Sequence, residues 1–280
     1  MDLQNSETLK DTLSQTAEHS GGDNWIMHHI MDGNYLDFTP FGKIYLPHLE
    51  IFGLDISITR HVVFLWISAA LLIFLMMKVS KAYKNSLVPK GVSNFFEVLI
   101  VFVRDEIAKP TIGKGYEKFV PYLLTAFFFI LLSNFLGLIP FSATITSNIS
   151  VTVVLAVSSF LVTQAGGIKK NGVFGYFKGL IPHGVPVFLL PIMFVVELLG
   201  LFTKPFALAI RLFANMTAGH IVIYALISLI FVMKSYFIAP VSIGMALFIY
   251  LLEVLVALLQ AYIFTMLSSL FIGMAVHQDH

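Results

Sequence analysis

One long stretch without charge limits what this chain can fold into more than any other feature. Residues 119–168 contain no Asp, Glu, Lys or Arg. A helix needs only about 20 apolar residues to cross a bilayer, so two membrane spans fit into this stretch. The whole chain agrees, because 12% of its residues are charged, against about 25% in an ordinary soluble protein. We therefore predict an all-α membrane protein.

Further apolar stretches raise the prediction to about five membrane helices and one helix on the membrane surface. Spans are expected near residues 61–77, 120–139 and 149–165, and within two long segments, 185–232 and 238–276. Residues 95–103 are strongly apolar but too short to cross a bilayer, and charged residues follow them directly. We expect this amphipathic segment to lie along the membrane surface.

The last two apolar segments are too long for simple spans. As continuous helices they would reach roughly 70 and 58 Å at 1.5 Å per residue, about twice a hydrocarbon core of around 30 Å. Each must therefore break or tilt steeply. Pro191 and Pro205 offer places to kink the first segment, whereas Pro240 stands at the start of the second, where a proline costs little.

The distribution of lysines predicts the orientation. The turn of the hairpin, residues 140–147, has no Lys or Arg, whereas the segment after the first span and the connection after the hairpin are basic: Lys78, Lys81, Lys84 and Lys90, then Lys169, Lys170 and Lys178. Basic loops are retained on the cytoplasmic side. We expect the N-terminus outside and the C-terminus in the cytoplasm.

The chain then divides into four parts. Residues 1–59 form an N-terminal extramembrane segment with short strands and turns, and residues 60–118 hold the first span and the surface helix. Residues 119–168 form a transmembrane hairpin, and residues 169–280 a cytoplasmic loop and two long helices. Residues 1–24 lack the apolar core of a signal peptide, so we expect the N-terminus to translocate unaided or to have been trimmed.

Several classes of function are disfavoured. A net charge of +1 without a clustered basic surface argues against a nucleic-acid partner. The chain has no cysteine, and the adjacent His28 and His29 lack the acids that would complete a metal site. No phosphate-binding loop, nucleophile elbow or pair of catalytic carboxylates is present. We expect no metal, no cofactor and no catalytic centre.

A polar stripe runs along the first long segment. Glu197, Lys204 and Arg211 are spaced by seven residues, so they return to within about 20° of one another on a helix, and Asn215 joins them at i+4. An arginine at the bilayer centre costs from about 2.5 to as much as about 17 kcal/mol, depending on the method. Arg211 must therefore be solvated, paired or facing an anion. Lys204 and Glu197 have the cheaper alternative of reaching the interface or pairing with each other.

Two titratable residues lie off this stripe. His220 points about 180° away from Arg211, and an unperturbed imidazole exchanges protons near neutral pH. The second long segment carries one acid, Glu253, with Gln260 on the same face seven residues later. A lone carboxyl group in a membrane suits the uptake and release of protons, although structural roles for both residues remain open.

Two runs carry a resemblance to a known family. The runs KPFALAIRLFANMTAGH (204–220) and LLEVLVALLQAYIF (251–264) resemble the membrane-embedded a-subunit family of F-type ATP synthases. SNFLGLIPF (133–141) and SNISVTVVLAV (147–157) match the family more loosely. The resemblance is most specific over residues 185–275, and it implies a proton-conducting stator subunit, without catalytic activity of its own, in a bacterial inner membrane.

The resemblance also implies partners and residue roles. The subunit would work beside a rotating ring of c subunits, within membrane lipid and held by a b-subunit peripheral stalk. Arg211 corresponds to the essential arginine between two proton half-channels, Asn215 and Gln260 to the amides near it, and Glu197 to an acidic channel position. His220 and Glu253 stand where some relatives have an acid and a histidine in the reverse order, so their assignment to half-channels stays open.

The sequence leaves alternative functions open. A self-contained transporter could use Arg211 to bind an anionic substrate, and a structural scaffold would tolerate its replacement by glutamine. An intramembrane enzyme lacks the Ser/His or paired Asp site that it would need. Sodium could replace protons, because the ring carboxylate that selects the ion lies on another chain.

Overall fold

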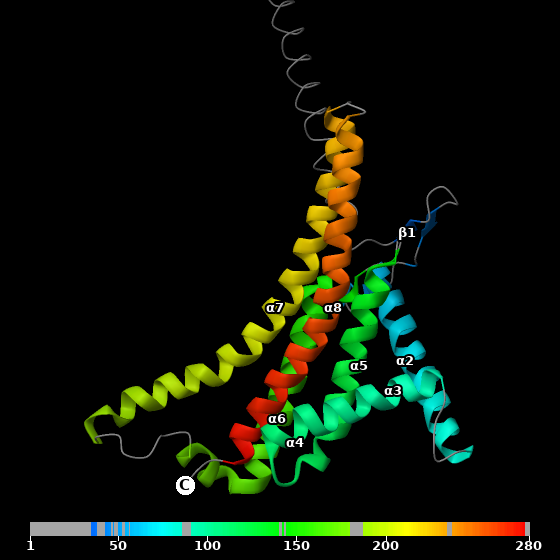
Figure 1. The fold of residues 1–280 in the computed structure, drawn as a ribbon. Coiled ribbons are helices and arrows are strands. Elements are labelled where there is room, and N and C mark those ends of the chain that lie inside the picture. The colour runs from blue at the N-terminus through cyan, green and yellow to red at the C-terminus, as the bar shows by residue number, and fades with distance from the viewer. Residues whose placement is uncertain are drawn as a thin grey trace, which may run out of the picture. The chain divides into compact units, whose positions relative to one another are not determined.

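Five apolar helices dominate the part of the chain that the structure describes. This computed structural model describes residues 35–37, 43–45, 47, 50–51, 54–55, 57–85, 91–139, 142, 144–179, 187–233 and 237–277. The helices long and apolar enough to cross a membrane are α2 (Arg60–Asn85), α5 (Val120–Gly137), α6 (Ile149–Lys178), α7 (Leu190–Met233) and α8 (Ile238–Val276) (Figure 1). The prediction of an all-α membrane protein is confirmed.

Short strands occur only before the first of these helices within the described residues. The strand β1 (Tyr35–Asp37) pairs antiparallel with β2 (Lys43–Tyr45), and β3 (Glu50–Ile51) pairs antiparallel with β4 (Leu54–Asp55). Predictions that concern residues 1–34, including His28 and His29, lie outside the described residues. The same holds for Lys90 and Pro140.

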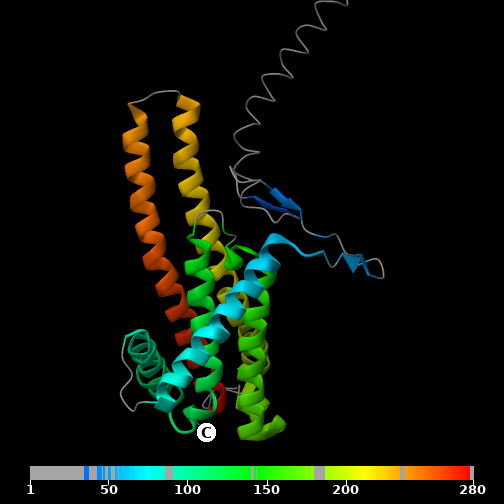
Figure 2. The ribbon, with the colours of Figure 1, turned by 90° about the vertical axis from the view of Figure 1, so that its right-hand side faces the viewer.

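The chain forms two compact units. One contains residues Met1–Arg60 and Asn215–Val254, and the other contains His61–Ala214 and Leu255–His280. The helices α7 and α8 therefore each contribute one segment to each unit. In the first unit these two segments run side by side, joined by a hydrogen bond from the Ser242 hydroxyl to the Leu226 carbonyl (Figure 2).

A bent helical segment in the second unit fits the predicted surface helix but is longer. It comprises α3 (Val92–Val101), a π-helical turn η1 (Phe102–Ala108) and α4 (Lys109–Ile112), and it runs across the directions of α2 and α5 (Figures 1 and 2). Val92, Phe95 and Val98 form an exposed stripe at a spacing of three residues. On the opposite side, Phe96 packs on Phe128 of α5, with 5.4 Å between the ring centroids.

The polar end of this segment carries an ion pair. The Arg104 guanidinium donates to both carboxylate oxygens of Asp105, at 2.9 and 2.8 Å. These hydrogen bonds lower the pKa of Asp105, and the same contact raises the pKa of Arg104. Both residues therefore stay charged at neutral pH, as expected at the edge of a membrane rather than within it.

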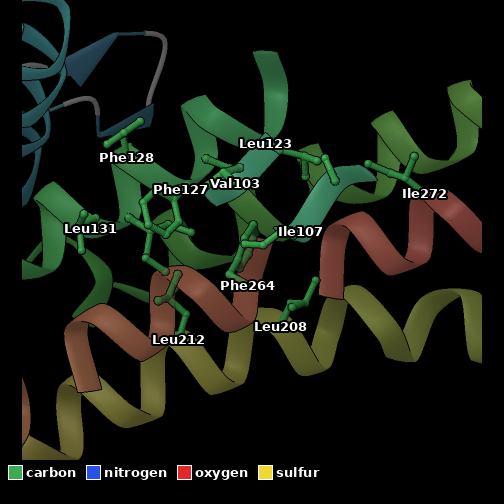
Figure 3. Close-up of a cluster of buried hydrophobic side chains, with 14 of the residues drawn as sticks. Val103, Ile107, Leu123, Phe127, Phe128, Leu131, Leu208, Leu212, Phe264 and Ile272 are labelled. Atoms are coloured by element: carbon green, nitrogen blue, oxygen red, sulfur yellow. The ribbon is translucent and has the colours of Figure 1, made fainter. Parts of the chain in front are cut away.

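The core of the second unit lies where η1 crosses the long helices. Val103 and Ile107 of η1 meet Phe127 of α5, Phe264 of α8 and Leu212 of α7 (Figure 3). All five are at most 1% exposed. Lipid tails are as apolar as these side chains, so close packing rather than escape from water holds such a core together.

Small and hydroxylated residues bring the helices into contact. The Ser68 and Ser133 hydroxyls join α2 to α5 at 3.1 Å, and the Ser159 hydroxyl donates to Ser268 at 2.8 Å, joining α6 to α8. Gly273 of α8 lies against the backbone of Thr111, where a Cβ would collide with the Thr111 carbonyl oxygen. Such contacts are typical of helix packing in membranes.

Asn134 connects the hairpin turn to α8. Its side chain is fully buried, accepts a hydrogen bond from the Thr146 hydroxyl at 2.6 Å and donates to the Ala257 carbonyl at 3.4 Å. The hairpin α5–α6 is thus attached to the segment of α8 that carries Gln260.

One helix differs from the sequence prediction, and another follows one of the two predicted alternatives. The helix α6 continues beyond residue 165 to Lys178, so Lys169 and Lys170 lie within it rather than in a connection, because long lysine side chains tolerate a helix end near the interface. Its backbone is interrupted at Gly172, where φ is 70°. The helix α7 is continuous through Pro205, so it tilts or projects beyond the bilayer instead of breaking.

We predict that Asn134→Leu destabilises the hairpin by about 1–3 kcal/mol, because it leaves the buried Thr146 hydroxyl without its acceptor and removes the side-chain hydrogen bond to the Ala257 carbonyl. Thermal unfolding of the purified protein in detergent would measure this. Thr125→Val, which removes only an exposed hydroxyl, should change the melting temperature little. Equal melting of Asn134→Leu and the native protein would contradict the role of Asn134.

Candidate functional site

A buried acid and a histidine pair within the first unit. His220 lies on α7 and Glu253 on α8, and 2.8 Å separate the imidazole Nδ1 from the carboxylate Oε1. Glu253 is only 4% exposed. The two residues that the sequence marked as proton carriers are therefore direct neighbours.

The surroundings of Nδ1 favour one position for a proton. The same nitrogen lies 3.0 Å from the carbonyl oxygen of Met216, one turn earlier on α7. A carbonyl can only accept a hydrogen bond, so Nδ1 must carry a hydrogen to satisfy it. That hydrogen is directed at the Met216 carbonyl, so Oε1 of Glu253 lies 2.8 Å from Nδ1 without a hydrogen bond from it, and neither Glu253 oxygen has a hydrogen-bond partner among the described residues.

Electrostatics limits the number of protons on the pair. An ionised pair and a neutral pair of His220 with Glu253 contain the same number of protons and have no net charge. One proton more or one fewer leaves a net charge in an apolar region, which is costly.

Two neighbours of the pair were not found from the sequence. A Cβ on Gly219 would meet the Glu253 carboxyl carbon at 2.8 Å, so a larger residue there would displace the carboxylate. The Tyr224 ring lies edge-on to His220, with 6.4 Å between centroids. The sequence held signals for both, because Gly219 directly precedes His220 and Tyr224 follows it at i+4.

Arg211 lies on α7 in the second unit. It is partly exposed, whereas Leu208 and Leu212 beside it are at most 3% exposed and pack in the core. Within the part of the chain that the structure describes, no carboxylate pairs with Arg211. The guanidinium therefore lies at the edge of the core, where a charge on another molecule can reach it.

The two amides predicted near Arg211 differ in burial. Asn215 is exposed at i+4 on α7, and Gln260 is 2% exposed on α8. Asn215 thus shares an accessible side of α7 with Arg211, as the helical spacing indicates. Gln260 belongs to the buried side of α8.

Glu197 and Lys204 line one cavity in the second unit. It encloses about 270 Å³ between α6, α7 and α8. The Lys204 ammonium lies 5.5 Å from the centroid of the Phe271 ring, and the described residues contain no ion pair between Lys204 and Glu197. Glu197 and Lys204 therefore do not form the ion pair that the sequence left open as the energetically less costly arrangement.

Sequence analysis missed most of the polar lining of this cavity. Ser159, Thr163, Gln164 and Tyr176 contribute from α6, and His277 follows α8. The Gln164 Nε2 is buried without a hydrogen-bond partner, which suits contact with water in a polar cavity. The sequence indicates these residues only as uncharged polar positions within apolar runs. Whether such a residue faces a cavity depends on how the helices pack, which the sequence does not show.

Comparison with known proteins agrees with the resemblance in the sequence. The family model described as ATP synthase A chain matches residues 62–273. "ATP synthase subunit a" of Chloroherpeton thalassium is 58% identical over 91% of this chain and 77% of the relative. "ATP synthase subunit a 2" of Chlorobaculum tepidum is 55% identical over 94% and 76%.

A more distant bacterium gives the same result. "ATP synthase subunit a" of an Anaeromyxobacter species is 48% identical over 91% of this chain and 71% of the relative. The matched region includes the helices that carry the His220–Glu253 pair, Arg211 and the cavity. The chain therefore belongs to the ATP synthase A chain family.

Proposed function

We propose that this chain is the proton-translocating stator subunit of an F-type ATP synthase, with no catalytic centre of its own. It works in the inner membrane of a bacterium beside a rotating ring of c subunits, and a b-subunit peripheral stalk holds it still. Its N-terminus is outside and its C-terminus is cytoplasmic. Membership of the ATP synthase A chain family supports the assignment.

The observation that carries the proposal is the buried contact between His220 and Glu253. With the N-terminus outside, α7 runs outward and α8 runs inward, so both residues lie in the outer halves of their helices. A proton from outside reaches the pair, which passes a proton on toward a ring carboxylate. Because the residues touch, we assign both to the same, outer half-channel.

The cavity at Glu197 supports a separate inner path. Glu197 precedes His220 by 23 residues on α7, which corresponds to about 35 Å of helix, more than a hydrocarbon core of around 30 Å. The two sites therefore lie on either side of Arg211 along the sequence of α7. We assign the cavity, with Gln164 and Tyr176, to the path by which protons leave.

Arg211 separates the two paths. A fixed cation repels protons and favours the ionised form of a carboxyl group that passes it. Each ring carboxylate would lose its proton near Arg211 and take up another after nearly a full turn. The membrane potential contributes about 2.3 kcal/mol per proton per 100 mV. Asn215 and Gln260 are proposed to position groups near the guanidinium.

We predict that Arg211→Ala abolishes proton-driven ATP synthesis while it leaves or increases passive proton leak. The cation that blocks a direct path would be absent, so protons would cross without turning the ring. Both quantities can be measured on proteoliposomes containing the whole complex. Arg211→Lys is the matched control. It keeps the positive charge but lacks the planar guanidinium, so it tests the effect of charge alone. Coupled synthesis retained in Arg211→Ala would refute the role.

A second prediction concerns exchange of the pair. His220→Ala and Glu253→Ala should each lower ATP synthesis by about tenfold or more, because the remaining group would lose the neighbour with which it can share a proton. The double exchange of His220→Glu with Glu253→His should restore part of the activity, since an acid and a histidine again share one proton. Restoration should be incomplete beside Gly219. A double variant no better than either single variant would argue against a shared function.

Gly219→Ala gives a third prediction. The added methyl group would push the Glu253 carboxylate away from His220 without removing a titratable group. We expect slower proton conduction and a changed pH dependence, with normal assembly judged by subunit content. Gly244→Ala is the control, because nothing lies within 4 Å of a Cβ at that position on α8. Equal rates in the two variants would show that the contact is not required.

A further inference from the structure

A groove on the second unit lies outside the proposed proton paths. The helices α2 and α5 meet at the buried Ser68 and Ser133 hydroxyls, and they diverge from there toward the end of α2 that carries Lys81 (Figure 1). The space between them forms a groove of about 880 Å³. Sites of about 300–1,000 Å³ hold ligands of moderate size.

The lining of the groove changes from apolar to basic along its length. Leu72, Ile73 and Met76 of α2 and Phe128 of α5 form the apolar wall, and Ser80 and Lys81 form the polar end. Lys81 is exposed and stands two residues before the end of the apolar span Arg60–Tyr83. The cation is therefore at the depth of lipid headgroups, and the apolar wall is at the depth of acyl chains.

The charges around the groove favour an anionic occupant. No acid is among the described residues that line it. Glu97 of the surface helix interacts with the Tyr83 hydroxyl and does not line the groove. Lys78, one turn before Lys81, lies over the Phe74 ring at 4.6 Å and does not line the groove. Lys81 thus offers an ammonium group to a phosphate at its open end.

The surroundings of the groove also suit lipid. Phe128 in the wall of the groove packs on Phe96 of α3. The same helix exposes Val92, Phe95 and Val98. Ile73 and Met77 at its mouth are each 59% exposed. We propose that the α2–α5 groove is a binding site for one anionic glycerophospholipid, with the phosphate at Lys81 and Ser80 and an acyl chain along the apolar wall.

The test is the lipid retained by the whole complex purified from membranes that contain phosphatidylglycerol and phosphatidylethanolamine. Native mass spectrometry should find phosphatidylglycerol bound to the subunit. Lys81→Gln should weaken its retention roughly fivefold, the effect expected of one basic side chain at a membrane surface. The matched control Lys78→Gln makes the same change of charge outside the groove and should retain the lipid.

A second variant separates the groove from the charge. Thr125→Trp fills the groove from α5 and keeps Lys81, so it should also lose the lipid. The proposal is overturned if the native complex retains no phosphatidylglycerol, or if Lys78→Gln and Lys81→Gln lose it equally. It is also overturned if a photoreactive residue in place of Ile73 captures a stalk subunit instead of lipid.

Discussion

The high cost of an isolated charge in a membrane governs the arrangement of the polar residues in this protein. A soluble protein can leave such groups in water, whereas here the long helices offer apolar surroundings on most sides. Glu253 is paired with His220, and Glu197 and Lys204 share a polar cavity. Arg211 has no acid near it among the described residues and stands partly exposed. In the proposed mechanism, each of these arrangements leaves a polar group that can interact with a mobile proton or with a carboxylate of the rotating ring.

The length of α7 links these polar groups along one helix. The helix α7 continues through Pro205 for 44 residues, about 66 Å at 1.5 Å per residue. One helix therefore carries Glu197, Arg211 and His220 in this order. In the proposed mechanism this order is also the order of function, with an inner path, a barrier and an outer path. Breaking the helix would uncouple the positions of the three groups.

The sequence predicted the fold class because charge-free segments and helix length depend only on local composition. It placed α8 with the bounds that the structure has, and it identified His220 and Glu253 as titratable. It ended α6 too early, because Lys169 and Lys170 resemble a loop by composition but continue the helix. The contact of Gly219 with Glu253 and the cavity beside Gln164 depend on packing between helices, which no periodicity within one helix reveals.

The central claim is that this chain couples proton flow to ATP synthesis. The most direct test is ATP synthesis by proteoliposomes that contain the whole complex, under either an imposed pH gradient or an imposed sodium gradient. The account predicts synthesis with the pH gradient in sodium-free buffer, and none with the sodium gradient once a protonophore collapses the pH gradient. Synthesis that depends on sodium, or that does not respond to the pH gradient, would contradict it.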